Sequence, residues 1–171
     1  IFPQKCPCGF ATVKEFNETT KKYDAVRRCP DKGYDCNLIT KEKLKHYVSK
    51  DAMNIEGLGK KVIENFWNLN LLKLPQDIYK LDFNKISKLE GWGKLSADNL
   101  KKSIEKTKKI NLDRFIFSLG IRHIGQENAK ILARFFKSVN NFKKLTNCKD
   151  QTYTDLIQLD GIGDTQVKSL K

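Results

Sequence analysis

The chain has 171 residues, of which 39% are hydrophobic and 31% are charged, a balance that allows a packed core and excludes a chain disordered throughout. Its 33 Lys and Arg residues outnumber its 20 Asp and Glu residues, which gives a net charge of +13. This excess favours a polyanionic partner, although a lysine-rich coding bias would also produce it.

The sequence contains no run of 18 apolar residues and no signal-peptide pattern. It therefore predicts a soluble, cytoplasmic protein without membrane association. The chain starts at Ile1 rather than at Met, and Lys171 comes shortly after the start of a predicted helix. We expect it to be a fragment of a longer protein.

Four of the five cysteines fall within the first 36 residues, as a Cys-x-Cys pair and a Cys-x6-Cys pair: Cys6, Cys8, Cys29 and Cys36. Clustered thiols in a cytosolic chain favour a structural zinc site, in which four thiolates complete a tetrahedral shell and leave no position for a catalytic water. Disulfides, or a knuckle that has lost its metal, are the alternatives. The first pair is one residue shorter than the usual Cys-x-x-Cys.

Between the cysteine pairs, residues 10–16 (FATVKEF) and 23–29 (YDAVRRC) flank a polar turn and predict a short β-hairpin. A ribbon this small cannot bury a core, so bound metal would supply most of its folding energy. We assign residues 1–38 to this zinc ribbon. Cys148 is expected to be an ordinary free thiol, and His46 a surface residue of the following helix rather than a ligand.

From residue 39 onwards the sequence predicts helices that are separated by a recurring turn. Its copies are IEGLGKKVI (55–63), LEGWGKLSA (89–97), the looser IRHIGQENA (121–129) and LDGIGDTQV (159–167). The turn centres Leu58, Trp92, Ile124 and Ile162 are 34, 32 and 38 residues apart, a period that indicates an array of supersecondary units. The predicted fold is therefore mainly α: four tandem helical hairpins over residues 39–171, the last one truncated, behind a small β ribbon.

Each part of the turn has a physical role. The first glycine supplies the positive φ that ends a helix, and the central apolar residue points into the core. The second glycine leaves room for a ligand beside the first amides of the next helix, where unpaired donors and the helix dipole favour an anion. A repeated group of unpaired backbone amides of this kind suits the phosphates of a nucleic-acid backbone. A compact connection in a helical scaffold is the alternative.

The four copies differ in charge. Lysines follow the first two turns, Arg122 precedes Gly125 in the third, and the acidic Asp164 follows the fourth, where Thr165 and Lys168 would have to compensate. The predicted DNA-contacting residues are Gly57, Gly59, Lys60, Lys61, Gly91, Gly93, Lys94, Arg122, Gly125, Gly161, Gly163, Thr165 and Lys168.

The sequence also predicts the environments of three other residues in or near the turns. The third turn has His123 in place of the first glycine, and this side chain is expected to pack or to form a hydrogen bond as a neutral group. Trp92 is expected in the core, with a partly exposed wedge near the minor groove as the alternative. Leu95 is expected on the apolar face of its helix, together with Leu100 and Ile104.

The turns resemble the helix-hairpin-helix motif of DNA repair and replication proteins. The order of a four-cysteine ribbon and four such turns is similar to the bacterial NAD-dependent DNA ligases. This resemblance runs from CPCG (6–9) and RRCPDKGYDC (27–36) through the glycine turns, and SLGIRHIG (118–125) is especially close to the third hairpin of that family.

The resemblance implies a parent enzyme that seals single-strand nicks with NAD and Mg²⁺, through an adenylated lysine. It implies that this segment follows an adenylation domain and an OB-fold, precedes a BRCT domain, and grips nicked double-stranded DNA from the minor-groove side as part of a monomer. Cys6, Cys8, Cys29 and Cys36 match the Zn²⁺ ligands of the family. The shortened first cysteine pair and Asp164 depart from its pattern.

The adenylation chemistry is not expected in this chain. The family attaches AMP to the lysine of a Lys-x-Asp-Gly motif, whereas residues 80–83 lack its glycine and residues 158–161 lack its lysine. We therefore predict no adenylation and no nick sealing by this segment alone. The alternative functions are a helix-hairpin-helix glycosylase, a DNA-binding module of another repair or recombination protein, and a protein–protein scaffold.

Overall fold

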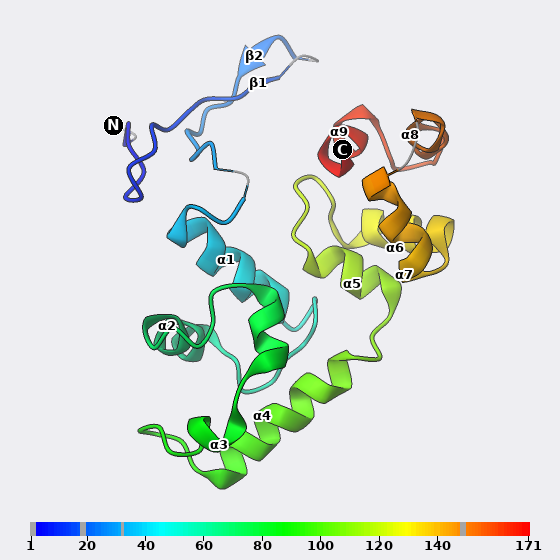
Figure 1. The fold of residues 1–171 in the computed structure, drawn as a ribbon. Coiled ribbons are helices and arrows are strands. Elements are labelled where there is room, and N and C mark those ends of the chain that lie inside the picture. The colour runs from blue at the N-terminus through cyan, green and yellow to red at the C-terminus, as the bar shows by residue number, and fades with distance from the viewer. Residues whose placement is uncertain (1–2, 18–19, 32, 148–149) are drawn as a thin grey trace. The chain divides into compact units, whose positions relative to one another are not determined.

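The computed structural model describes residues 3–17, 20–31, 33–147 and 150–171, and Figure 1 shows its fold. The chain divides into two compact units, Ile1–Glu42 and Lys43–Lys171. Helix α1 (Asn37–Val48) starts in the first unit and ends in the second. The division into residues 1–38 and 39–171 stays a prediction, and Cys148 lies outside the described residues.

The first unit contains a small β ribbon, as predicted. Strand β1 (Phe16–Asn17) pairs antiparallel with β2 (Lys22–Tyr23), and an isolated bridge between Val13 and Arg28 extends this pairing. A second bridge, between Lys5 and Ala11, closes the loop around Cys6 and Cys8. Phe16 lies opposite Tyr23, and their rings meet edge to face with centroids 5.1 Å apart. Both rings remain largely exposed, so the pair does not form a closed apolar core.

The rest of the described chain is helical, which confirms the predicted fold class. The further helices are α2 (Lys60–Asn68), α3 (Phe83–Ile86), α4 (Lys94–Thr107), α5 (Leu112–Ser118), α6 (Gln126–Phe136), α7 (Val139–Lys143), α8 (Asp150–Ile157) and α9 (Asp164–Leu170), with 3₁₀ helices at Pro75–Lys80 and Lys144–Asn147. The four predicted turns precede α2, α4, α6 and α9 (Figure 1). Within the described ranges, no helix is long and apolar enough to cross a membrane.

The second unit has two separate apolar cores. The first core gathers buried side chains from α1 to α4, among them Leu44, Phe66 and Leu100. The second core gathers buried side chains from α5 to α9, among them Ile116 and Leu132. The hairpins therefore pack in two pairs, one pair for each core, as units too short to bury their apolar faces alone must do.

The turn centres anchor each hairpin to its core. Leu58, Ile124 and Ile162 are 1%, 5% and 3% exposed. Trp92 is half-buried and packs on the first core, with its ring centroid 5.4 Å from that of Phe66. Trp92 is thus a partly exposed residue that packs on the core.

The first residue of each turn has a left-handed backbone. Gly57, Gly91 and Gly161 have φ of +88°, +76° and +86°, and His123 has φ of +63° at the corresponding place in the third turn. A side chain in this conformation costs roughly 1 kcal/mol, so the third turn keeps the backbone of the others at some strain. His123 is exposed, so the expectation that it packs is wrong, and the alternative of a hydrogen bond stays a prediction.

Helix α1 ends at Val48, and the chain then turns back through Asn54, whose φ is +54° and whose N–H donates to the Ser49 carbonyl. One further sequence-based expectation needs correction. His46 is half-buried and is not a surface residue. Its Nε2 lies 2.7 Å from the Phe117 carbonyl oxygen, on a helix 71 residues away in sequence.

Candidate nucleic-acid interface and metal centre

The four predicted cysteines come together at one point of the ribbon. Their Sγ atoms all lie within 4.8 Å of one another, with Cys6 and Cys36 at 3.7 Å and Cys8 and Cys29 at 3.8 Å. A tetrahedral metal with a metal–sulfur bond of about 2.3 Å, the value for zinc, separates its sulfurs by about 3.8 Å. The thiols are therefore already spaced to hold such a metal, and zinc fits them.

Backbone hydrogen bonds build the knuckle around the short first pair. The N–H of Gly9 donates to the Cys6 carbonyl at 2.8 Å, and the N–H of Cys6 donates to the Phe10 carbonyl at 2.8 Å. Gly9 has φ of +96°, which lets the chain reverse directly after Cys8. Although the Cys6–Cys8 spacing is one residue shorter than Cys-x-x-Cys, both sulfurs therefore reach the cluster.

Asp31 organises the loop between Cys29 and Cys36. The sequence did not lead us to predict this role of Asp31. Its carboxylate accepts from the N–H of Gly33 at 2.9 Å and from the N–H of Cys36 at 2.8 Å. An Asp two residues before a Gly is a common Asx-turn pattern, so this signal was present in the sequence. The carboxylate fixes the loop that brings Cys36 to the cluster.

One thiol of the cluster has a raised pKa, which bears on how the cluster would bind a metal. Burial, followed by hydrogen bonds with the thiols of Cys8, Cys6 and Cys36, raises the pKa of Cys29 to about 12. Cysteine binds a metal as the thiolate, so metal binding here would release protons and weaken as the pH falls.

The four turns share one hydrogen-bond pattern. The N–H of each central residue donates to the carbonyl three residues earlier, at 3.4 Å for Leu58, 3.0 Å for Trp92, 3.1 Å for Ile124 and 3.0 Å for Ile162. The second glycine then caps the next helix in an extended conformation and accepts the first helical hydrogen bond. The looser third copy therefore has the same geometry as the other three.

The second glycines are not required by the fold. Their φ values are −73° at Gly59, −149° at Gly93, −83° at Gly125 and −112° at Gly163, all open to any residue. A Cβ at Gly59 or Gly93 would meet no atom of the described chain within 4 Å, and at Gly125 the nearest atom would be 3.8 Å away. Ser, Asp or Asn would cap these helices at least as well as Gly. The absence of a side chain therefore leaves open space on the outside of the turn.

The donors that face this space belong to the residues after the second glycine. At three turns the glycine N–H already donates to the third residue of the helix: Gly93 to Ser96 at 2.9 Å, Gly125 to Asn128 at 3.2 Å and Gly163 to Gln166 at 3.1 Å. The first amides of each helix have no intrahelical acceptor and point along its axis. The candidate anion site is thus formed by the amides that follow the glycine.

Charge distinguishes the turns. Lys60 and Lys61 open α2 and Lys94 opens α4, and all three are exposed. In contrast, α6 opens with Gln126 and Glu127, whose carboxylate pairs with Lys130 at 2.7 Å, and α9 opens with an exposed Asp164. A negative group suits the dipole of a free helix N-terminus but repels a phosphate there. The first two turns are therefore the more favourable anion sites.

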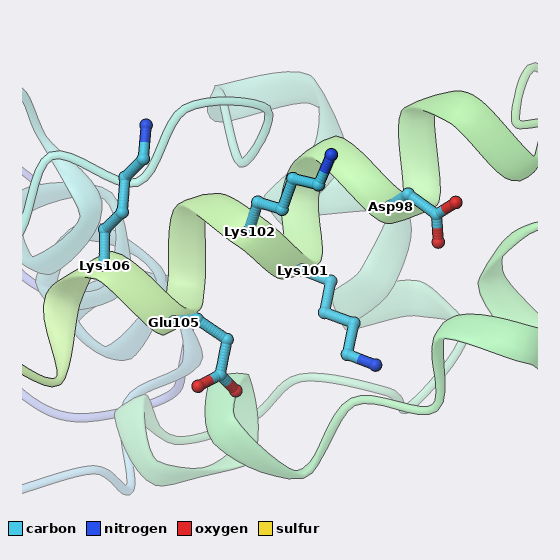
Figure 2. A pocket seen from close by; sticks show the side chains of 5 residues that line it. All are labelled: Asp98, Lys101, Lys102, Glu105 and Lys106. Atoms are coloured by element: carbon cyan, nitrogen blue, oxygen red, sulfur yellow. The ribbon is translucent and has the colours of Figure 1, made fainter.

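Helix α4 extends the charged surface beyond its turn. Figure 2 shows Lys101, Lys102 and Lys106 on α4, beside Asp98 and Glu105, where they line a shallow hollow. Leu95, in the first turn of the same helix, is 76% exposed. The expectation that it lies on the apolar face is wrong, because the helix buries Ala97 and Leu100 instead.

Direct contacts hold the turns of each pair together. A Cβ on Gly57 would lie 3.6 Å from Leu100 on α4, so the first turn packs against the helix of the second hairpin. The amide of Asn128 on α6 donates to the Gly161 carbonyl at 2.7 Å, which joins the third hairpin to the fourth turn. In each pair, one turn is thus held against a helix of the neighbouring hairpin.

The fold and its turns define a helix-hairpin-helix protein with a four-cysteine ribbon. Residues 114–171 match the family model described as helix-hairpin-helix motif. The whole chain is 59% identical to part of a protein named DNA ligase from Pelagibacter ubique, and 99% of it is 41% identical to part of a DNA ligase from Parvibaculum lavamentivorans. A DNA ligase from Rickettsia rickettsii matches 82% of the chain at 45% identity.

The chain covers 25%, 25% and 22% of the lengths of these three relatives, respectively. The chain is therefore similar to a segment that makes up about a quarter of the length of proteins named DNA ligase. The predicted resemblance to DNA ligases is confirmed.

Replacing the first and the second glycine of a turn should have different effects on stability. Gly93→Ala should change the free energy of unfolding by less than about 1 kcal/mol, since the backbone is extended and the space is open. Gly161→Ala should cost about 1–2 kcal/mol, since its φ is positive; its Cβ would also lie 2.8 Å from Ile131 Cδ1, a side-chain end that can shift at little cost. Urea unfolding followed by circular dichroism measures both. Equal losses would show that the second glycine serves the fold.

Proposed function

We propose that this chain is the DNA-gripping segment of an NAD-dependent DNA ligase, and that it binds nicked double-stranded DNA through phosphate contacts at its hairpin turns. Its relatives are named DNA ligase, and its net charge of +13 suits a polyanion. The observation that carries the proposal is the open space beside Gly59 and Gly93, which no packing contact among the described residues explains.

A phosphate must come within about 2.9 Å of a backbone N–H to accept its hydrogen bond, and a side chain at the second glycine would stand in its way. With glycine there, a phosphate oxygen can reach the first amides of α2 and α4, while Lys60, Lys61 and Lys94 supply charge beside it. Main-chain amides and lysines read phosphates rather than bases, so binding should show little sequence preference.

The four turns should contribute unequally. The first two combine an open glycine with lysines and form the main contacts in this proposal. At the third turn Arg122, which is exposed, stands in for the missing lysine. At the fourth turn the contact depends on Thr165 and Lys168, because Asp164 opposes a phosphate. We further propose that these contacts approach the duplex from its minor-groove side.

The chemistry of nick sealing belongs, in this proposal, to parts of the ligase outside this segment. NAD and Mg²⁺ would bind in an adenylation domain, with an OB-fold and a BRCT domain in the same chain. The segment positions the duplex, and acts in a monomeric, cytoplasmic enzyme. A DNA-binding module of another repair protein is less well supported, because the relatives over the whole chain are named DNA ligase.

We also propose that Cys6, Cys8, Cys29 and Cys36 hold a structural Zn²⁺. Four sulfur ligands leave no open coordination position, so the metal supplies folding energy to the ribbon and no catalysis.

Removal of the metal should unfold the ribbon selectively. We expect one zinc per chain by elemental analysis, its loss in Cys36→Ser, and its extraction by a strong chelator with loss of the ribbon's NMR signals. Most of the helical circular dichroism should remain, because the cores of the second unit contain none of the cysteines. A chain that purifies without zinc from zinc-supplemented medium, or that unfolds completely on chelation, would contradict this.

Duplex binding should depend steeply on salt and on the second glycines. If six or more phosphates are contacted, affinity for a labelled nicked duplex should fall by on the order of 10³ between about 50 and 200 mM salt, with unrelated sequences competing equally. Gly59→Val and Gly93→Val should each weaken binding by about tenfold or more, through the loss of charge-assisted hydrogen bonds.

The matched control for these variants is Gly163→Val, which adds the same side chain beside Asp164 and should lose less affinity. Circular dichroism checks that all three variants are folded. If folded Gly59→Val and Gly93→Val bind as the unmodified chain does, the proposed contact is wrong.

A further inference from the structure

We propose that Arg114 and His46 form a polar joint that fixes the first pair of hairpins relative to the second, so that both pairs meet one duplex together. Neither residue lies in a predicted turn. The consequence for DNA binding rests on the proposed function, whereas the joint itself can be tested without DNA.

Arg114 joins α5 to the loop that leads into the first turn. Its Nε donates to the Ala52 carbonyl at 2.9 Å, and its Nη2 donates to the Lys50 carbonyl. Both carbonyls lie in the bend that follows α1. A guanidinium that spans two carbonyls fixes direction as well as distance, because its donors are held in one plane.

His46 makes the second contact, from α1 to the end of α5. Its Nε2 lies 2.7 Å from the Phe117 carbonyl oxygen, and its ring packs edge to face on the Phe117 ring with centroids 4.7 Å apart. A carbonyl only accepts, so Nε2 carries the proton in this contact. Gly120 fits closely over the imidazole: it has φ of +61°, and a Cβ there would lie 3.2 Å from His46 Cδ2.

These contacts matter because the two apolar cores are separate. Among the described residues, no buried side chain belongs to both cores. Each core can therefore stay folded while the orientation between them depends on directional contacts at the joint. A hydrogen bond contributes only about 1 kcal/mol to stability, but its geometry restricts rotation.

The joint adjoins the sites that it would align. The bend held by Arg114 leads into the turn at Gly57, and α5 leads into the turn at Gly125. If both pairs bind the same duplex, their released counterions add to one salt dependence. Without the joint, one pair would bind while the other remains free, and fewer phosphates would be contacted at a time.

The orientation is measured on the unmodified chain and on Arg114→Met/His46→Leu by residual dipolar couplings of the amides in α4 and α6, without DNA. We expect one alignment tensor to fit both helices in the unmodified chain, and two different tensors in the double variant. His46→Gln keeps a donor and should preserve the single tensor. Arg134→Met is the charge control, since Arg134 on α6 is exposed and its Nε donates to the Lys130 carbonyl of its own helix at 3.4 Å.

A double variant that still fits one tensor would overturn the joint, whether or not the chain binds DNA. If the double variant does not fold, Arg114→Lys and His46→Leu are measured singly, with the same criterion. The salt dependence of duplex binding then tests its role: the slope should fall by about half in the double variant, and by about one phosphate or less in Arg134→Met. An unchanged slope in a variant with two tensors would overturn the positioning role. Failure of the unmodified chain to bind duplex would overturn the proposed function. The existence of the joint would then still be decided by the tensor measurement, which is made without DNA.

Discussion

Burial of one apolar side chain beneath each turn is the constraint on which the hairpin unit depends. Leu58, Ile124 and Ile162 are almost fully buried, and Trp92 covers the first core through its contact with Phe66. Each buried centre holds its turn against a core, which requires the residue before it to have positive φ and places the next glycine outside. Without this anchor the amides that open the following helix would not be held in fixed positions.

The arrangement separates the requirements of folding from those of binding. The first residue of each turn is restricted by its backbone, as the left-handed His123 shows by keeping the same conformation with a side chain. Among the described residues, a Cβ at the second glycine would lie no closer than 3.4 Å to another side chain or backbone atom. This free space, together with the lysines beside the first two turns, supports the proposal that an anion approaches these positions from outside.

Local patterns in the sequence predicted the ribbon, the cysteine cluster and the four turns, because spacing along the chain encodes them. Contacts between distant segments could not be predicted from local patterns: His46 contacts a carbonyl 71 residues away, and Arg114 contacts one that is 62 residues away. Leu95 was wrongly predicted to lie on the apolar face of α4, because this helix begins at the surface and buries its apolar face only from Ala97 onwards. The role of Asp31 was readable from its Asx-turn pattern.

The most direct test of the phosphate contact follows the backbone amides themselves. In a ¹⁵N-labelled sample titrated with nicked duplex at low salt, we expect the amide signals of Lys60, Lys61 and Lys94 to shift most. These signals should return on addition of salt, and those after Gly163 should shift less. If DNA shifts other parts of the surface and leaves the amides after Gly59 and Gly93 unchanged, the open glycines are not where the backbone of DNA binds.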